Sequence, residues 1–138
     1  MMAEALNVFM RWLHISSVAG LVGGMIYGRV VMTASAGELA PEARQALEER
    51  AAALFRPIVV VTLVCLMFSG VYNIVSYTGH TARYHILLGV KLLLVAHIFV
   101  SAIMIVQPRN RRRARQTAGA AIAGIIVIAI SAYLRTIY

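Results

Sequence analysis

Acidic residues are scarce in this chain and absent from its apolar runs. Only five of the 138 residues carry a carboxylate side chain, and all five lie in polar segments: Glu4, Glu38, Glu42, Glu48 and Glu49. Hydrolytic acid–base chemistry and carboxylate-based proton pumping both use carboxylates placed inside the fold, so the sequence argues against both classes. The single cysteine, Cys65, excludes an intrachain disulfide, and with only four scattered histidines it leaves no cluster for structural zinc.

Apolar residues, by contrast, make up 61% of the sequence and gather into four long runs. A helix that spans a membrane needs about 20 mostly apolar residues, and each run is long enough. The sequence therefore predicts one all-α domain over residues 1–138, a transmembrane four-helix bundle. Proline suits the first position of a helix, so the second helix is expected to begin at Pro41. A proline inside a helix can kink it, so a kink is expected at Pro57. A short turn is expected over 78–81. The predicted helices cover residues 6–32, 41–77, 83–106 and 118–137.

The formal net charge of +8 is distributed unevenly along the chain. Nine of the thirteen Lys and Arg residues lie in or beside the connections after the first and third helices, with a cluster at Arg109–Arg115. Positive charge in short loops marks the cytoplasmic side of a membrane, so both termini are expected outside and the Arg109–Arg115 loop in the cytoplasm. The pattern predicts a multi-pass protein of the cell (inner or plasma) membrane in contact with the lipid bilayer, and no nucleic-acid partner.

Lys91 and His14 are ionisable side chains within apolar runs, where such residues are costly and usually functional. At 1.5 Å per residue, both lie roughly 12 Å inside the membrane from the same surface, on helices that run in the same direction. The sequence therefore predicts a polar site between the first and third helices, in the outer half of the bundle. His85 is a shallower alternative on the third helix, while His97 lies too deep to share a level with His14.

Further candidate residues share the faces of these two side chains. Ser17 follows His14 by one helical turn, and the second helix carries a polar stripe that includes Tyr72 and Asn73 in the outer half. In lipid, such a stripe turns toward protein or water. The stripe predicts either hydrogen bonds between helices or groups that orient a bound ligand.

Three glycines of the first helix, Gly20, Gly24 and Gly28, follow one another at spacings of four. Such spacing lets two helix backbones approach closely. The face predicts helix packing within the bundle or across a homodimer, and the alternative is a flat ligand pressed against Gly24.

Two short motifs resemble a known group of small membrane proteins. They are Leu13-His14 with Gly24, Tyr27 and Arg29 in the first helix, and the segment Leu88–Leu94 that contains Lys91 in the third. The chain resembles the group around HemJ-type protoporphyrinogen oxidase and the CopD-type copper-resistance domain. In the HemJ group, a histidine of the first helix and a lysine of the third are associated with a b-type haem, and His14 and Lys91 are the matching residues.

The resemblance implies an integral membrane protein that binds haem b and has a redox or haem- and porphyrin-handling role. His14 would be one axial ligand, and Lys91 a second ligand if neutral or a propionate partner if charged. If the protein is an enzyme, the resemblance implies a haem-dependent membrane oxidoreductase with a porphyrin or quinone-type partner. The alternatives are a CopD-like permease for copper or a small solute, and a cofactor-free assembly subunit. The seven methionines form no repeated pair at ligand spacing, which weighs against a copper path.

Overall fold

The computed structural model describes residues 1–76 and 82–136, and it contains no strand within these ranges. The helices are α1 (Met2–Tyr27), the π-helical segment η1 (Gly28–Met32), α2 (Thr33–Ala36), α3 (Pro41–Val75), α4 (Ala82–Ile105) and α5 (Arg113–Thr136). Four helical stretches are long and apolar enough to cross a membrane, the first of them formed by α1, η1 and α2 together. The all-α four-helix prediction is confirmed, and the composition indicates an integral membrane protein.

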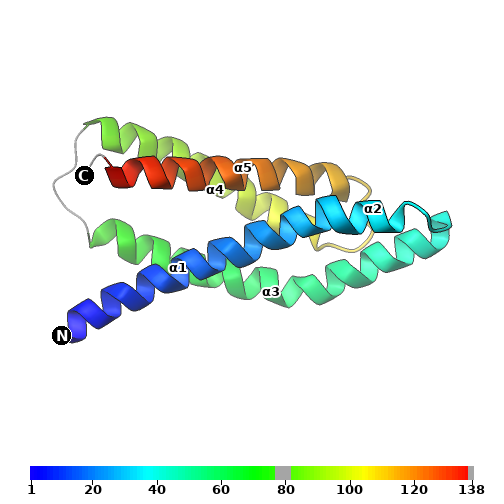
Figure 1. The fold of residues 1–138 in the computed structure, drawn as a ribbon, viewed down its shortest axis with the longest axis horizontal. Helices are drawn as coiled ribbons and strands as arrows, with labels where there is room; N and C mark the ends of the chain where they lie inside the picture. Colours follow the sequence, from blue (N-terminus) through cyan, green and yellow to red (C-terminus); the bar gives the residue numbers. More distant parts are fainter. Residues whose placement is uncertain (77–81, 137–138) are drawn as a thin grey trace.

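The helix boundaries differ from the predicted ones mainly where helices extend beyond the apolar runs. Proline begins α3 as expected, at Pro41, and Pro57 lies inside the same helix. Figure 1 shows that α3 changes direction about midway along its length. The last helix begins at Arg113, five residues before the predicted start, because its first turn is polar and gives no hydropathy signal. The predicted turn at 78–81 lies outside the described residues.

The helices are arranged as two pairs. α1 packs on α3, α4 packs on α5, and α1 also contacts α5, whereas α3 and α4 touch only slightly. The beginning of α1 and the end of α5 lie at one end of the bundle, which we call the terminal end. The connections between α2 and α3 and between α4 and α5 lie at the opposite end, the arginine end (Figure 1).

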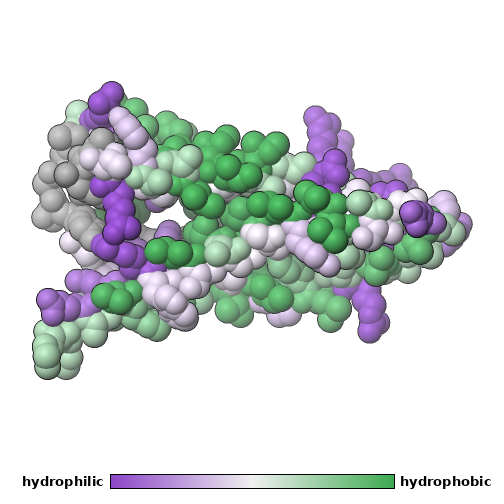
Figure 2. All heavy atoms as spheres, viewed as in Figure 1, coloured by the Kyte–Doolittle hydropathy of each residue, from purple (hydrophilic) through white to green (hydrophobic). Residues whose placement is uncertain are grey.

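The buried core occupies the half of the bundle nearer the arginine end. Its members come from all four spans: Leu21, Met25, Val59, Leu63, Ile98, Ala102, Ile105, Val106, Ala120, Ala121, Ala123 and Val127. In the terminal half, by contrast, no residue before Ser17 in α1 and none after Ser69 in α3 is buried. The two helix pairs therefore diverge toward the terminal end, and Figure 2 shows the surface open between them there.

The exterior of the bundle is apolar around its middle. Figure 2 shows a broad hydrophobic band, with hydrophilic residues gathered toward the two ends. Large apolar side chains such as Val8, Phe68 and Leu93 are 69%, 69% and 75% exposed. In water this surface would be an aggregation hazard, whereas lipid tails are as apolar as leucine, so the band fits a bilayer environment.

Arginines at the arginine end also hold the helix termini together. Arg113 donates from Nε to the carbonyl oxygen of Ile105 at 2.8 Å, at the end of α4. Arg56 of α3 donates to the carbonyl oxygen of Val106, with its terminal nitrogen at 2.9 Å. The last carbonyls of a helix lack partners within the helix, so these guanidinium groups complete the end of α4. Part of the arginine cluster is therefore structural.

The three-glycine face of α1 lies inside the bundle. A Cβ atom built on Gly20 would lie 3.9 Å from Thr62 of α3, and one on Gly28 would lie 4.0 Å from Thr117 of α5. At Gly24 the Cβ atom would come within 2.6 Å of Phe55 Cζ, the far end of a flexible side chain. The face thus packs against helices of the same chain, and the homodimer through it stays a prediction.

Candidate functional site

His14 and Ser69 form the central contact of the site. His14 Nδ1 lies 2.9 Å from Ser69 Oγ, which joins α1 to α3 in the terminal half. Ser69 is fully buried, at 0% exposure, and His14 is half-buried. A Cβ atom on Gly70 would lie 3.6 Å from His14 Cε1, so the imidazole packs directly against the α3 backbone at this glycine.

The geometry around Ser69 determines which imidazole nitrogen carries the proton. Ser69 Oγ lies 2.6 Å from the carbonyl oxygen of Cys65, one turn back along α3, and donates its only hydrogen there. With that hydrogen donated to Cys65, Ser69 Oγ acts as the acceptor toward His14, and this arrangement favours the tautomer with the proton on Nδ1. A neutral imidazole has one donor and one acceptor nitrogen. The lone pair of His14 is therefore on Nε2.

Lys91 approaches the same region from α4. It is half-buried in the middle of the helix, and its charge lies within electrostatic reach of His14. Within residues 1–76 and 82–136, neither His14 Nε2 nor the Lys91 ammonium has a hydrogen-bond partner or an ion pair. The structure thus brings His14 of α1 and Lys91 of α4 into one region, where the two helix pairs diverge.

The other predicted residues are distributed along α1, α3 and α4. Ser17 is buried at 6% exposure, one turn from His14 toward the core. Tyr72 donates from its hydroxyl to Asn7 Oδ1 at 2.6 Å, which ties α3 to α1 nearer the terminal end. Asn73 lines a small polar cavity of about 140 Å³ beside Asn7. Tyr72 is therefore hydrogen-bonded to Asn7, and the polar group that contacts the imidazole is Ser69.

Two predicted residues lie apart from this contact. His85 is exposed in the first turn of α4, where its ring meets the edge of Tyr84 with the ring centroids 5.8 Å apart. Gly24 lies ten residues beyond His14, about 15 Å along the helix. It lines a separate cavity nearer the arginine end, beside Met25 and Phe55.

Ser69 is the residue of the site that sequence reasoning did not select. It belongs to the polar stripe of α3, together with Tyr72 and Asn73, so its face could be predicted. Its level could also be estimated, because Ser69 lies about 12 Å before the predicted end of the second helix at residue 77, and His14 about 12 Å after the predicted start at Leu6. The pairing itself depends on α1 lying next to α3, which the sequence does not specify.

The side chains near His14 suit a cofactor that needs few ligands from the protein better than a metal ion that the protein binds directly. The described part of the chain holds no group of three or more His, Cys, Asp or Glu side chains arranged to bind a metal ion directly. Haem iron needs only one or two axial ligands, because the porphyrin supplies the other four, and a neutral imidazole is a standard ligand. The side chains of Leu94, Val95 and Phe99 of α4 are partly buried and pack against the hydrophobic core. A neutral His14 with a lone pair on Nε2 has the chemistry of such an axial ligand.

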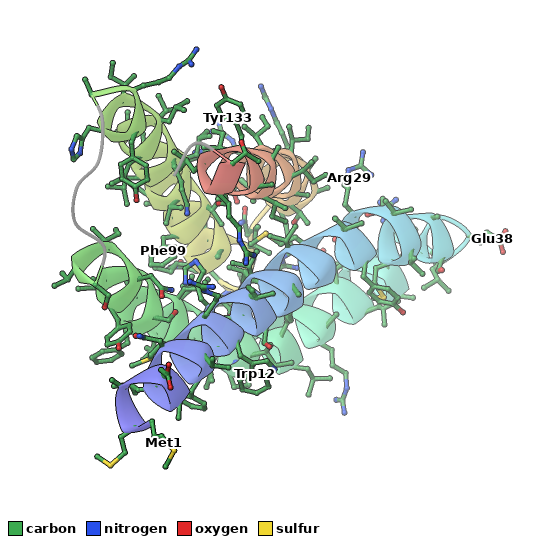
Figure 3. All side chains as sticks on the ribbon, turned by 60° about the vertical axis from the view of Figure 1, so that its left-hand side comes forward. Met1, Trp12, Arg29, Glu38, Phe99 and Tyr133 are labelled. Carbon is green, nitrogen blue, oxygen red and sulfur yellow. The ribbon has the colours of Figure 1, made fainter. Side chains whose placement is uncertain are left out.

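Several bulky side chains of the terminal half point outward. Trp12 is 60% exposed and Tyr133 is 46% exposed, and Figure 3 shows Tyr133 directed away from the bundle. These aromatic groups therefore face the surroundings, and they do not fill the space between the helix pairs.

Comparison with protein families, with curated proteins and with solved structures finds no match for this chain.

Proposed function

We propose that this integral membrane protein binds a b-type haem in the terminal half of the bundle, between α1 and α4, with His14 as an axial ligand. The proposed role is redox chemistry or the handling of haem and porphyrins. A bound haem would supply one-electron chemistry at its iron. The chain would supply the axial ligand, an apolar surround and the hydrogen bonds that tune the iron.

The observation that carries the proposal is the orientation of His14. Ser69 accepts the hydrogen bond from Nδ1, which leaves the lone pair on Nε2. Ligating histidines in proteins almost always donate their other ring nitrogen to an oxygen in this way, since the bond fixes the ring and makes the ligand more basic.

Lys91 and the divergence of the helix pairs support the same assignment. A lysine in the middle of a membrane span is costly unless it has a partner. A haem between α1 and α4 would provide one, either as iron coordinated by neutral Lys91 or as a propionate paired with its ammonium. The scarcity of buried side chains in the terminal half leaves room for a flat ligand between the pairs. Ser17, Tyr72 and Asn73 would form the polar edges of that site.

The proposed orientation places the arginine end in the cytoplasm of a cell membrane and the haem in the outer half. In a Cys65→Ser background, cysteines at the exposed positions Ser76 and Arg111 report the two ends. A membrane-impermeant maleimide applied to intact cells is expected to label position 76 and to reach position 111 only after permeabilisation. Labelling of position 111 in intact cells would reverse the orientation and move the haem to the cytoplasmic half.

The experiment that tests haem binding is the absorption spectrum of the protein purified from cells supplied with ample haem. The wild type is expected to show a Soret band, and Ser69→Ala to lower haem affinity by about 10–100-fold, as loss of a ligand's hydrogen-bond partner does. The matched control is Ser131→Ala, because Ser131 also donates to a carbonyl one turn back, at 2.7 Å, but on α5. A colourless wild type, or equal losses in the two variants, would contradict the proposal.

A further inference from the structure

A second cavity, separate from the proposed haem site, lies between α1, α3 and α5 toward the arginine end. Its volume is about 590 Å³, in the range of ligand-binding pockets. The lining of this second cavity changes along its length. Gly24, Met25, Phe55 and Ile58 line it nearer the middle of the bundle, and Arg29, Thr33 and Glu48 line it nearer the arginine end.

The cavity extends from the apolar middle of the bundle toward its polar arginine end. On α3 its lining runs from Glu48 to Ile58, ten residues or about 15 Å along the helix. The apolar part faces the core of the bundle, and the polar part lies beside the arginine-rich connections. A molecule that matched this gradient would have an apolar chain and a polar head group, oriented as a lipid is in the bilayer.

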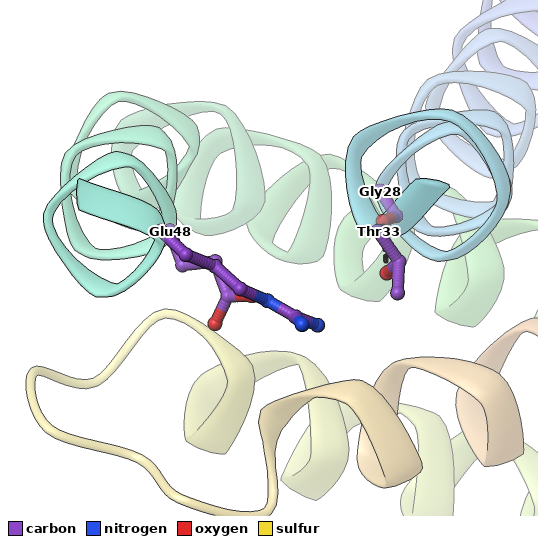
Figure 4. Close-up of polar contacts among 4 residues, drawn as sticks. Gly28, Thr33 and Glu48 are labelled. Atoms are coloured by element: carbon purple, nitrogen blue, oxygen red, sulfur yellow. Dashed lines mark hydrogen bonds and ion pairs between the residues drawn. The ribbon is translucent and has the colours of Figure 1, made fainter. Parts of the chain in front are cut away.

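The charges at the polar part favour an anion. Glu48 is paired with Arg44 of the same helix, with Nε and Oε1 3.1 Å apart, so its carboxylate is balanced. Figure 4 shows Glu48 on α3 and Thr33 on the opposite side of the space between these elements. Arg29 is among the residues that line the cavity, and it makes no hydrogen bond or ion pair with any residue in the described ranges. Its guanidinium can therefore bind an anionic group at the mouth.

The wall that α1 and η1 contribute to this cavity has an unusual backbone in η1. Residues 28–32 form a π-helical turn, and Thr33 Oγ1 donates to the carbonyl oxygen of Gly28 at 3.2 Å. Single π-helical turns within α-helices occur frequently at functional sites. Next to this turn, Gly23 has no atom within 4 Å of a built Cβ, so the cavity wall is open at that position.

We propose that this cavity binds an anionic phospholipid, with one acyl chain against the Gly23–Gly24 wall and the phosphate beside Arg29. Arginine provides a bidentate match for phosphate oxygens, and basic side chains near a membrane surface favour anionic lipid. The proposal is independent of haem binding, because the two sites lie in different halves of the bundle.

The test uses a single tryptophan as a reporter in the cavity. In a Trp12→Phe, Tyr27→Trp variant, the only tryptophan lies in the cavity lining, where bromine on a bound acyl chain quenches its fluorescence. The protein is reconstituted in vesicles with either brominated phosphatidylglycerol or brominated phosphatidylcholine. We expect phosphatidylglycerol to associate about fivefold more strongly, the effect of one basic side chain near an anionic lipid.

Two variants test whether the preference belongs to the cavity. Gly23→Leu should fill it and abolish the preference, whereas the control Gly119→Leu, also a site with nothing near a built Cβ but outside the lining, should retain it. Arg29→Gln leaves the volume of the cavity unchanged and removes the positive charge, so it should reduce the preference for phosphatidylglycerol. This second variant tests the proposal even if Gly23→Leu fails to fold. Equal quenching by the two lipids in the parent protein would overturn the proposal. So would a preference that persists in both Arg29→Gln and a folded Gly23→Leu.

Discussion

Replacing His14 with Ala is expected to yield a protein that folds and purifies without haem. The substitution removes the imidazole whose Nδ1 contacts Ser69 and whose Nε2 makes no hydrogen bond with the described residues. Without the axial bond, only apolar contact would retain the porphyrin, and detergent competes for that contact. The measurement is the ratio of haem to protein by pyridine haemochrome assay, which should fall to the background of a membrane protein that binds no haem.

Two comparisons separate a ligand from a structural histidine. His97→Ala removes an exposed histidine on α4 and should leave the haem content unchanged. Adding free imidazole to haem-reconstituted His14→Ala should restore a low-spin spectrum, because the small ligand can occupy the space left by the side chain. In the same assay, Lys91→Ala is expected to change the spectrum while haem remains bound, since one axial ligand can suffice. A His14→Ala spectrum identical to that of the wild type would rule out His14 as the ligand.

Much of the fold could be predicted because hydropathy and charge act locally along the chain. The apolar runs are long enough to define four spans, and proline at position 41 marks the beginning of α3. Hydropathy does not show where a helix begins or ends if its terminal turn is polar, because polar residues look the same in a helix as in a loop. The start of α5 at Arg113 was therefore predicted five residues too late.

The site was less predictable, because it depends on which helices are neighbours. Equal depth on parallel helices was enough to relate His14 to Lys91, and the structure places them within electrostatic reach of each other. The contact between His14 and Ser69 requires that α1 pack on α3, and a hydropathy pattern does not rank helix neighbours. The π-helical turn at Gly28–Met32 likewise has no composition signal. In this turn the backbone hydrogen bonds span five residues where those of an α-helix span four, and the helix is otherwise continuous.

The close approach of α1 to α5 at Gly124 also depends on which helices are neighbours, and it yields the second large prediction. A Cβ atom on Gly124 of α5 would lie 2.7 Å from Val22 Cγ2 and 3.1 Å from Val22 Cγ1. Val22 is buried, and a β-branched side chain in a helix has one strongly preferred rotamer, so it cannot swing aside. Gly124→Leu should therefore separate α1 from α5. Overpacking costs about 1–3 kcal/mol or more, and thermal unfolding in detergent should show a clearly lower midpoint.

The matched control for Gly124→Leu is Gly119→Leu on the same helix, where a built Cβ meets nothing within 4 Å and the midpoint should change little. A smaller pair of substitutions tests the contact directly. Gly124→Ala alone should destabilise the bundle, and Val22→Ala in the same protein should recover part of that loss, because it removes both Cγ atoms that lie too close. The third nearby atom, Val22 Cβ, would lie at an ordinary 3.5 Å. Strictly additive effects of the two alanines would show that α1 and α5 do not meet at this position.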